Sequence, residues 1–106
     1  MKDLQAFFED LATNESLAKK IEGVKENSKI VEIARKEGYE FTKNDFDKVM
    51  LGMVSGGFDI PYDAISSTLE DIAEGIRDGE SFVSLVKIAG ASAISQAVKY
   101  LLTRFL

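Results

Sequence analysis

The sequence contains no cysteine and no histidine among its 106 residues. These two absences remove disulfides, thiolate and imidazole metal ligands, and the usual nucleophile–base pairs of enzymes. A metal site would have to be built from carboxylates alone, and the chain has no calcium-type loop of clustered Asp, Asn and Gly. We therefore expect no enzyme activity, no catalytic residue, no metal and no cofactor.

Positive charge is also scarce, because 13 Lys and Arg stand against 18 Asp and Glu, giving a net charge of −5 at pH 7. Contacts to phosphates need a surplus of cationic side chains, so the composition argues against nonspecific binding to nucleic acid. No stretch approaches the roughly 18 uninterrupted apolar residues of a spanning helix. The N-terminal residues lack the pattern of a secretory signal, so we expect export to need another address.

The chain does have helical periodicity and the composition of one small folded domain, with 45% hydrophobic residues and a single proline. Four short helices are expected before residue 57. The residues expected to face the core of the first helix are Leu4, Phe7, Phe8 and Leu11. The predicted N-terminal caps of the next three helices are Asn14, then Asn27 or Ser28, then Thr42 with Asp45. The second helix is predicted to end at Gly23 and the third at Gly38.

The second half of the chain is electrically polarised. Residues 58–80 hold seven acidic residues and one arginine, whereas residues 82–106 hold three cations and no acid. Pro61 suits a first helical turn, and Ser81 is expected to begin a strongly apolar stretch that bends at Gly90. The apolar stripe of the acidic segment is Ile65, Leu69, Ile72, Ala73 and Ile76. The fold class predicted is all-α: a small bundle of about four short helices, followed by an amphipathic helical part of two to three helices.

The first 57 residues resemble the leader peptides of the Nif-eleven-type family, which head precursors of ribosomally made, post-translationally modified natural products. No single element carries this resemblance; the order and spacing of several do. These elements are Leu4-x-x-Phe7-Phe8-x-x-Leu11, Asn14-x-x-Leu17-x-x-x-Ile21, Ile33-Ala34-x-x-x-Gly38-Tyr39-x-Phe41-Thr42, and Asp45-Phe46. The resemblance implies that Leu4, Phe7, Phe8 and Leu11 show part of their face to a modification enzyme while also serving as core.

Leaders of this kind typically end in a double glycine, after which a peptidase domain fused to an ABC exporter cuts the chain. Gly56-Gly57 lies at the expected place. Two residues without side chains fit a narrow protease channel, and an upstream helix can lay an apolar row into a groove. The row implied here is Phe46, Leu51 and Val54, at twelve, seven and four positions before the cut. Gly52 is expected to weaken that helix.

The resemblance therefore implies two segments: a leader-like helical domain over residues 1–57 and a helical product over residues 58–106. The precursor is expected in the cytoplasm, and the product, of a bacteriocin-like kind, is expected to be secreted. The partners implied are the modification enzyme and the peptidase-containing exporter, and no nucleic acid.

Two alternatives remain open at this level. The cationic tail, with Lys87, Lys99 and Arg104, has the pattern of a helix that contacts a membrane surface, but the same apolar residues serve equally well as half of a helical core. We favour core packing in the uncleaved chain, because an exposed apolar helix invites aggregation. The alternative function is an uncleaved helical interaction or scaffold domain that binds a partner enzyme.

Overall fold

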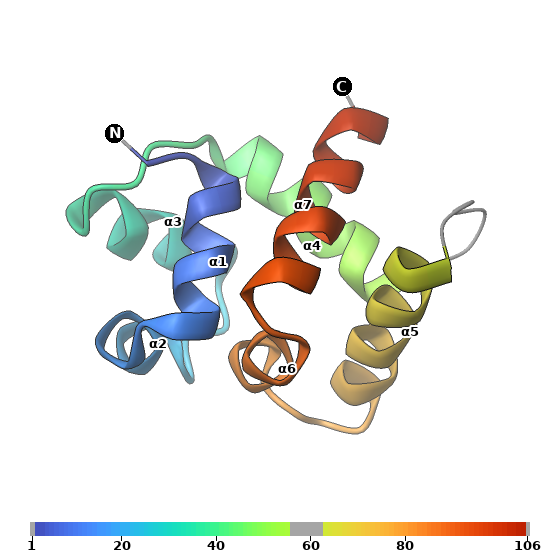
Figure 1. The fold of residues 1–106 in the computed structure, drawn as a ribbon. Helices are drawn as coiled ribbons and strands as arrows, with labels where there is room; N and C mark the ends of the chain where they lie inside the picture. Colours follow the sequence, from blue (N-terminus) through green and yellow to red (C-terminus); the bar gives the residue numbers. More distant parts are fainter. Residues whose placement is uncertain (1, 56–62, 106) are drawn as a thin grey trace.

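The computed structural model describes residues 2–55 and 63–105, and it is helical throughout these ranges apart from loops and one isolated β-bridge. The all-α prediction is confirmed (Figure 1). The described helices are α1 (Leu4–Thr13), α2 (Glu15–Ile21), α3 (Asn27–Lys36), α4 (Lys43–Ser55), α5 (Asp63–Arg77), α6 (Phe82–Ala89) and α7 (Ala91–Phe105). The prediction for Pro61 falls outside the described residues.

Capping side chains set most of the helix starts. The Asp3 carboxylate accepts a hydrogen bond from the amide of Ala6, and the Asn14 side chain accepts one from the amide of Leu17. Ser81 caps α6 in the same way. Each bond satisfies an amide that the first turn of a helix would otherwise leave without an acceptor. The predicted caps at Asn14 and Ser81 are therefore confirmed.

The prediction for the start of α3 is wrong. The residue before this helix is Glu26, and its side chain makes no capping hydrogen bond. The amide group of Asn27 instead donates to the carboxylate of Asp47, 2.8 Å away in α4. The side chain that the sequence suggested as a cap is thus used to tie α3 to α4.

The apolar C-terminal stretch is two helices, as the expected bend at Gly90 implied. Gly90 has φ 89° and ψ 158°, a conformation that is essentially restricted to glycine. The chain therefore turns between α6 and α7, and the two helices leave this point in different directions (Figure 1).

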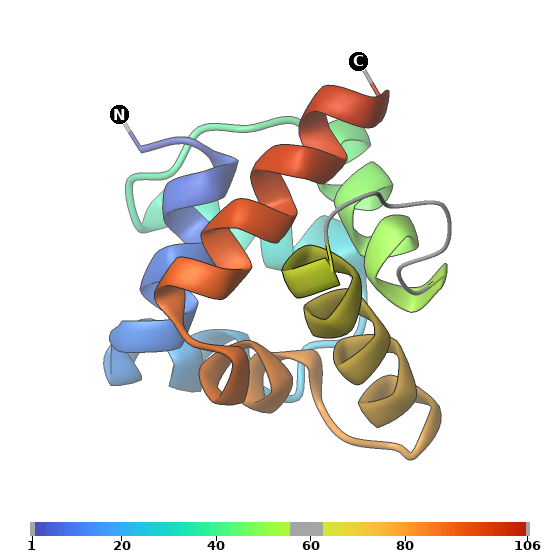
Figure 2. The same cartoon turned by 45° about the vertical axis from the view of Figure 1, so that its right-hand side comes forward.

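One hydrophobic core joins all seven described helices. Helix α7 lies between α1 on one side and α4 and α5 on the other (Figures 1 and 2). Its residues Ile94, Ala97, Val98 and Leu101, which share one face, are at most 3% exposed. The tail is thus packed as half of the core in the whole chain, which is the alternative that the sequence favoured.

Lys2, just before α1, is fixed by backbone pairing with the loop between α3 and α4. The amide of Lys2 donates to the carbonyl of Gly38 at 3.3 Å, and the amide of Glu40 donates to the carbonyl of Lys2 at 2.7 Å. Gly38 has φ 94°, which allows the chain to leave α3 and run back beside Lys2. The predicted stop at Gly38 is confirmed.

Candidate recognition and cleavage site

Helix α4 leads directly to the predicted cut, because it ends at Ser55, next to Gly56. The helix is held at its start by Thr42, whose hydroxyl oxygen accepts a hydrogen bond from the amide of Asp45 at 3.0 Å. Gly56 and Gly57 themselves lie outside the described residues. The part of the predicted recognition site that the structure describes is therefore the last two turns of α4.

Two residues of the predicted apolar row, Leu51 and Val54, are exposed. Leu51 is 59% exposed and Val54 is 42% exposed. They are three positions apart, so they share one face of α4. Their neighbours Gly52 and Met53 face inward and are buried. The chain thus presents a small apolar surface, Leu51 and Val54, immediately before the double glycine.

Phe46, the third residue of the predicted row, is fully buried. Its ring lies 6.3 Å from that of Phe7, 6.0 Å from that of Phe8 and 5.9 Å from that of Phe41, measured between centroids. Such a cluster gains from ring–ring contacts as well as from burial. In the folded chain Phe46 is a core residue, and its predicted contact with a peptidase requires this cluster to open.

The four residues predicted to meet a modification enzyme are also core. Leu4 is 3% exposed, and Phe7, Phe8 and Leu11 are not exposed. The rings of Phe7 and Phe8 pack on that of Phe46 within the leader, and helices α6 and α7 also pack against α1. Recognition of these four residues by an enzyme stays a prediction, and it requires this core to open.

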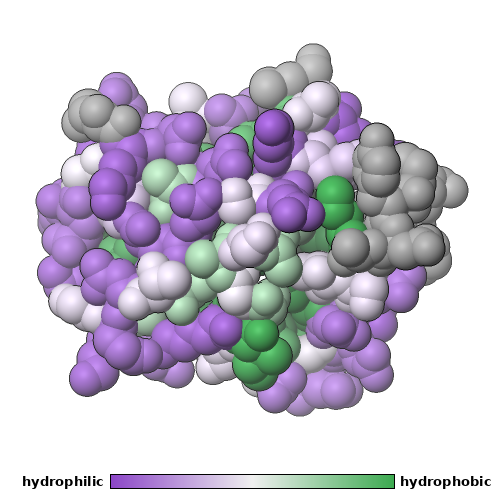
Figure 3. All heavy atoms as spheres, viewed as in Figure 1, coloured by the Kyte–Doolittle hydropathy of each residue, from purple (hydrophilic) through white to green (hydrophobic). Residues whose placement is uncertain are grey.

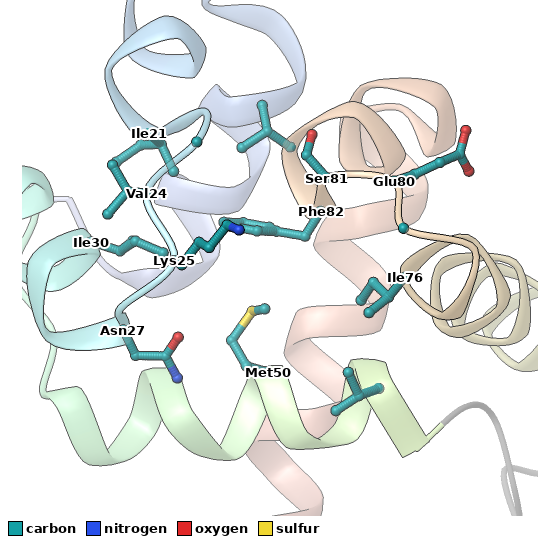
Figure 4. Close-up of a pocket in the computed structure, with 14 residues that line it drawn as sticks. Ile21, Val24, Lys25, Asn27, Ile30, Met50, Ile76, Glu80, Ser81 and Phe82 are labelled. Atoms are coloured by element: carbon teal, nitrogen blue, oxygen red, sulfur yellow. The ribbon is translucent and has the colours of Figure 1, made fainter.

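A cavity of about 340 Å³ lies beside the exposed face of α4. It is bounded by α4, by the loop between α2 and α3, and by the loop between α5 and α6 (Figure 4). Met50 and Val54 line it from α4, while Ile30, Ile76 and Phe82 close its other walls. Val54 therefore belongs both to the exposed surface and to the rim of an apolar hollow.

Polar side chains of Lys2, Asp10 and Tyr39 form a small hydrogen-bonded group beside α1. The Tyr39 hydroxyl donates to the Asp10 carboxylate at 2.5 Å, and the Lys2 ammonium donates to the same oxygen at 2.9 Å. Burial acts to raise the pKa of the Asp10 carboxyl, but the hydrogen bonds from Tyr39 and Lys2 and the charge of Lys2 outweigh it, so this pKa is lowered. Burial, the hydrogen bond to Asp10 and the Asp10 charge raise the pKa of the Tyr39 phenol.

The described residues contain no cluster of three or more acidic side chains arranged to hold a metal ion. No helix within 2–55 or 63–105 is both long enough and apolar enough to cross a membrane. The outer surface in the view of Figure 3 is mainly hydrophilic, with apolar groups gathered near its centre and where α6 lies.

Gly52 has a role that the sequence alone did not indicate. A Cβ atom at this position would collide with a side-chain methyl group of Leu101 and lie 3.0 Å from the other. Glycine therefore lets α7 pack closely on α4, in addition to lowering the helix propensity of α4. The residue predicted only to weaken the helix is a contact point between the two segments of the chain.

Residues 1–46 match the family model of the Nif11 domain. This range covers α1 to α3 and the opening turn of α4, the part of the chain that holds the buried aromatic cluster. The resemblance to the Nif-eleven-type leaders is confirmed over these residues. No curated protein and no solved structure matches the chain.

Proposed function

We propose that the chain is the precursor of a ribosomally made, modified natural product. Residues 1–57 are the leader, which a modification enzyme and the peptidase domain of an ABC exporter bind, and cleavage after Gly57 releases residues 58–106. The released segment is a helical, bacteriocin-like product that is secreted. Its cationic residues Lys87, Lys99 and Arg104 suit contact with an anionic membrane surface. The precursor itself is cytoplasmic and is not an enzyme.

The observation that carries this proposal is the exposed pair Leu51 and Val54 on the last turns of a helix that ends beside Gly56-Gly57, in a chain with a Nif11 domain. Apolar side chains that project from a helix are what a hydrophobic groove binds. A peptidase could dock on this face without unfolding α4, whereas Phe46 would have to leave the core.

The test is to incubate the full chain with the cognate exporter's peptidase domain and to read the products by mass spectrometry. A fragment that begins at Phe58 is expected, and Gly56→Val should abolish it because a side chain no longer fits the channel. Leu51→Asp should slow cleavage, whereas Asn44→Asp, an exposed change elsewhere on α4, should not. An intact chain after prolonged incubation would contradict the proposal.

The uncleaved interaction domain is a second candidate because both segments share one core. In that case the whole chain is the working unit, and a partner enzyme binds its outer surface. Limited proteolysis separates the two candidates: protection of the bond after Gly57 against the peptidase and against general proteases favours the uncleaved domain. Rapid cutting between residues 55 and 58 favours the precursor.

A further inference from the structure

The surface between the two segments has the character of a protein interior. Helices α6 and α7 pack on α1, and α5 and α7 pack on α4. No polar or charged residue is buried among the described residues, so this surface is apolar at its centre. The tail residues that contribute to the shared core are Leu69, Ile72, Val83, Leu85, Val86, Ile94, Ala97, Val98 and Leu101. Apolar centres of this kind are typical of permanent rather than transient interfaces.

Specific contacts cross this surface at two well-separated places. At one end of α7, Leu101 lies against Gly52, where any larger residue would collide with it. Near the start of α7, the side-chain amide of Gln5 in α1 donates to the hydroxyl of Ser95 at 2.7 Å. These contacts fix α7 along its length rather than at a single point.

Helix α6 is held toward the C-terminal end of α1, where α2 begins. The Lys87 ammonium lies 2.6 Å from a carboxylate oxygen of Glu15, at the start of α2. The ring centroids of Phe8 and Phe82 are 6.5 Å apart. The two contacts bring α6 against the junction of α1 and α2, so both tail helices have their own partners in the leader.

All of these contacts involve residues outside the stretch 56–62. Breaking the backbone after Gly57 therefore removes none of these contacts. It only ends the high effective concentration of each segment near the other that a single chain provides. We propose that residues 1–57 remain bound to residues 58–106 as a non-covalent partner after the chain is cut. The leader is then a holder of the product as well as its recognition segment.

The face that the leader holds is the face that a membrane surface would bind. Ile94, Val98 and Leu101 form the apolar stripe of α7 and are covered in the folded chain, whereas Lys99 and Arg104 are exposed. An amphipathic helix binds an anionic surface through these same two kinds of residue. Separation from the leader, and not peptide-bond cleavage, is therefore the step that uncovers the stripe.

The experiment uses the full chain with residues 56–62 replaced by the recognition sequence of a site-specific protease. After complete cutting, size-exclusion chromatography and circular dichroism are measured. A single species of about the intact mass of 11.7 kDa, with unchanged helicity, is expected. Two separating fragments, or loss of helicity on cutting, would overturn the proposal.

Variants on the leader side locate the interaction while leaving the tail sequence intact. Gly52→Leu favours the helical state of α4 but overfills the contact with Leu101, so the cut fragments should bind each other roughly tenfold more weakly. Asn44→Leu introduces the same side chain at an exposed position of α4 and should leave the binding unchanged. If Gly52→Leu does not fold before cutting, Gly52→Ala takes its place. Equal binding by both variants would show that the fragments associate elsewhere.

The proposal rests on the proposed function only for the position of the cut. Because the cut is made by an introduced site, the result does not depend on whether the exporter's peptidase accepts the chain. If the exporter's peptidase does not cut the chain but the fragments made at the introduced site stay associated, the proposed function is refuted and the non-covalent association stands. If the peptidase cuts the chain but the fragments separate, the association is refuted and the proposed function stands.

Discussion

Replacing Ile94 by alanine tests whether the two segments form one cooperative unit. Ile94 is fully buried in α7, and the change removes three carbon atoms from the shared core. At about 0.8 kcal/mol for each buried methylene group, with a further cost for the cavity, the free energy of unfolding should fall by about 3 kcal/mol. A domain of this size is stable by about 5–15 kcal/mol, so the loss is large and measurable.

The assay is hydrogen exchange of backbone amides, followed by mass spectrometry of peptides from α1. If α1 opens only together with α7, its most protected amides should exchange roughly 150-fold faster in the Ile94→Ala variant. Ile88→Ala is the matched control because Ile88 is 78% exposed, and its effect should stay within about 0.5 kcal/mol. Unchanged protection of α1 with faster exchange in α7 would show that the two segments unfold independently.

Three further predictions concern single groups. Tyr39→Phe removes a hydrogen bond to a carboxylate and should lower the free energy of unfolding by about 1–2 kcal/mol in urea titrations; an unchanged midpoint would mean that Lys2 alone satisfies Asp10. Because the pKa of Asp10 is lowered in the folded chain, its contribution is present above the ordinary pKa of an aspartate and is lost as pH falls through the lowered value. Thermal unfolding between pH 5 and pH 2 should therefore show a smaller loss of stability in Asp10→Asn than in the original chain, and equal slopes would contradict this. Gly90→Ala forces a side chain into a conformation that glycine almost alone adopts and should cost about 1–3 kcal/mol; a stabilised variant would indicate that α6 and α7 can merge into one helix.

Local signals in the sequence predicted the helical framework well. Side-chain caps at Asn14 and Ser81 and the stop at Gly38 act within one turn of the residue concerned, so they can be read without knowing the tertiary structure. The start of α3 was missed because Asn27 bonds to Asp47, a residue 20 positions away. A contact over that distance along the chain overrides a cap that local pattern alone favours.

The candidate site was harder to predict than the fold. Phe46, Leu51 and Val54 look equivalent as apolar residues ahead of a double glycine, yet the first is buried and the other two are exposed. The difference depends on which face of α4 the rest of the core covers: Phe46 packs on Phe7, Phe8 and Phe41, and the sequence of α4 does not contain that information. The role of Gly52 depends in the same way on Leu101, almost half the chain away.

The pairing of Lys2 with the backbone at Gly38 and Glu40 joins two distant points of the region that matches the Nif11 model. It clips the beginning of α1 to the loop that leads into α4, so these two points move together although the chain between them runs through two other helices. A displacement of the start of α1 therefore has to break these two hydrogen bonds or carry the loop before α4 with it.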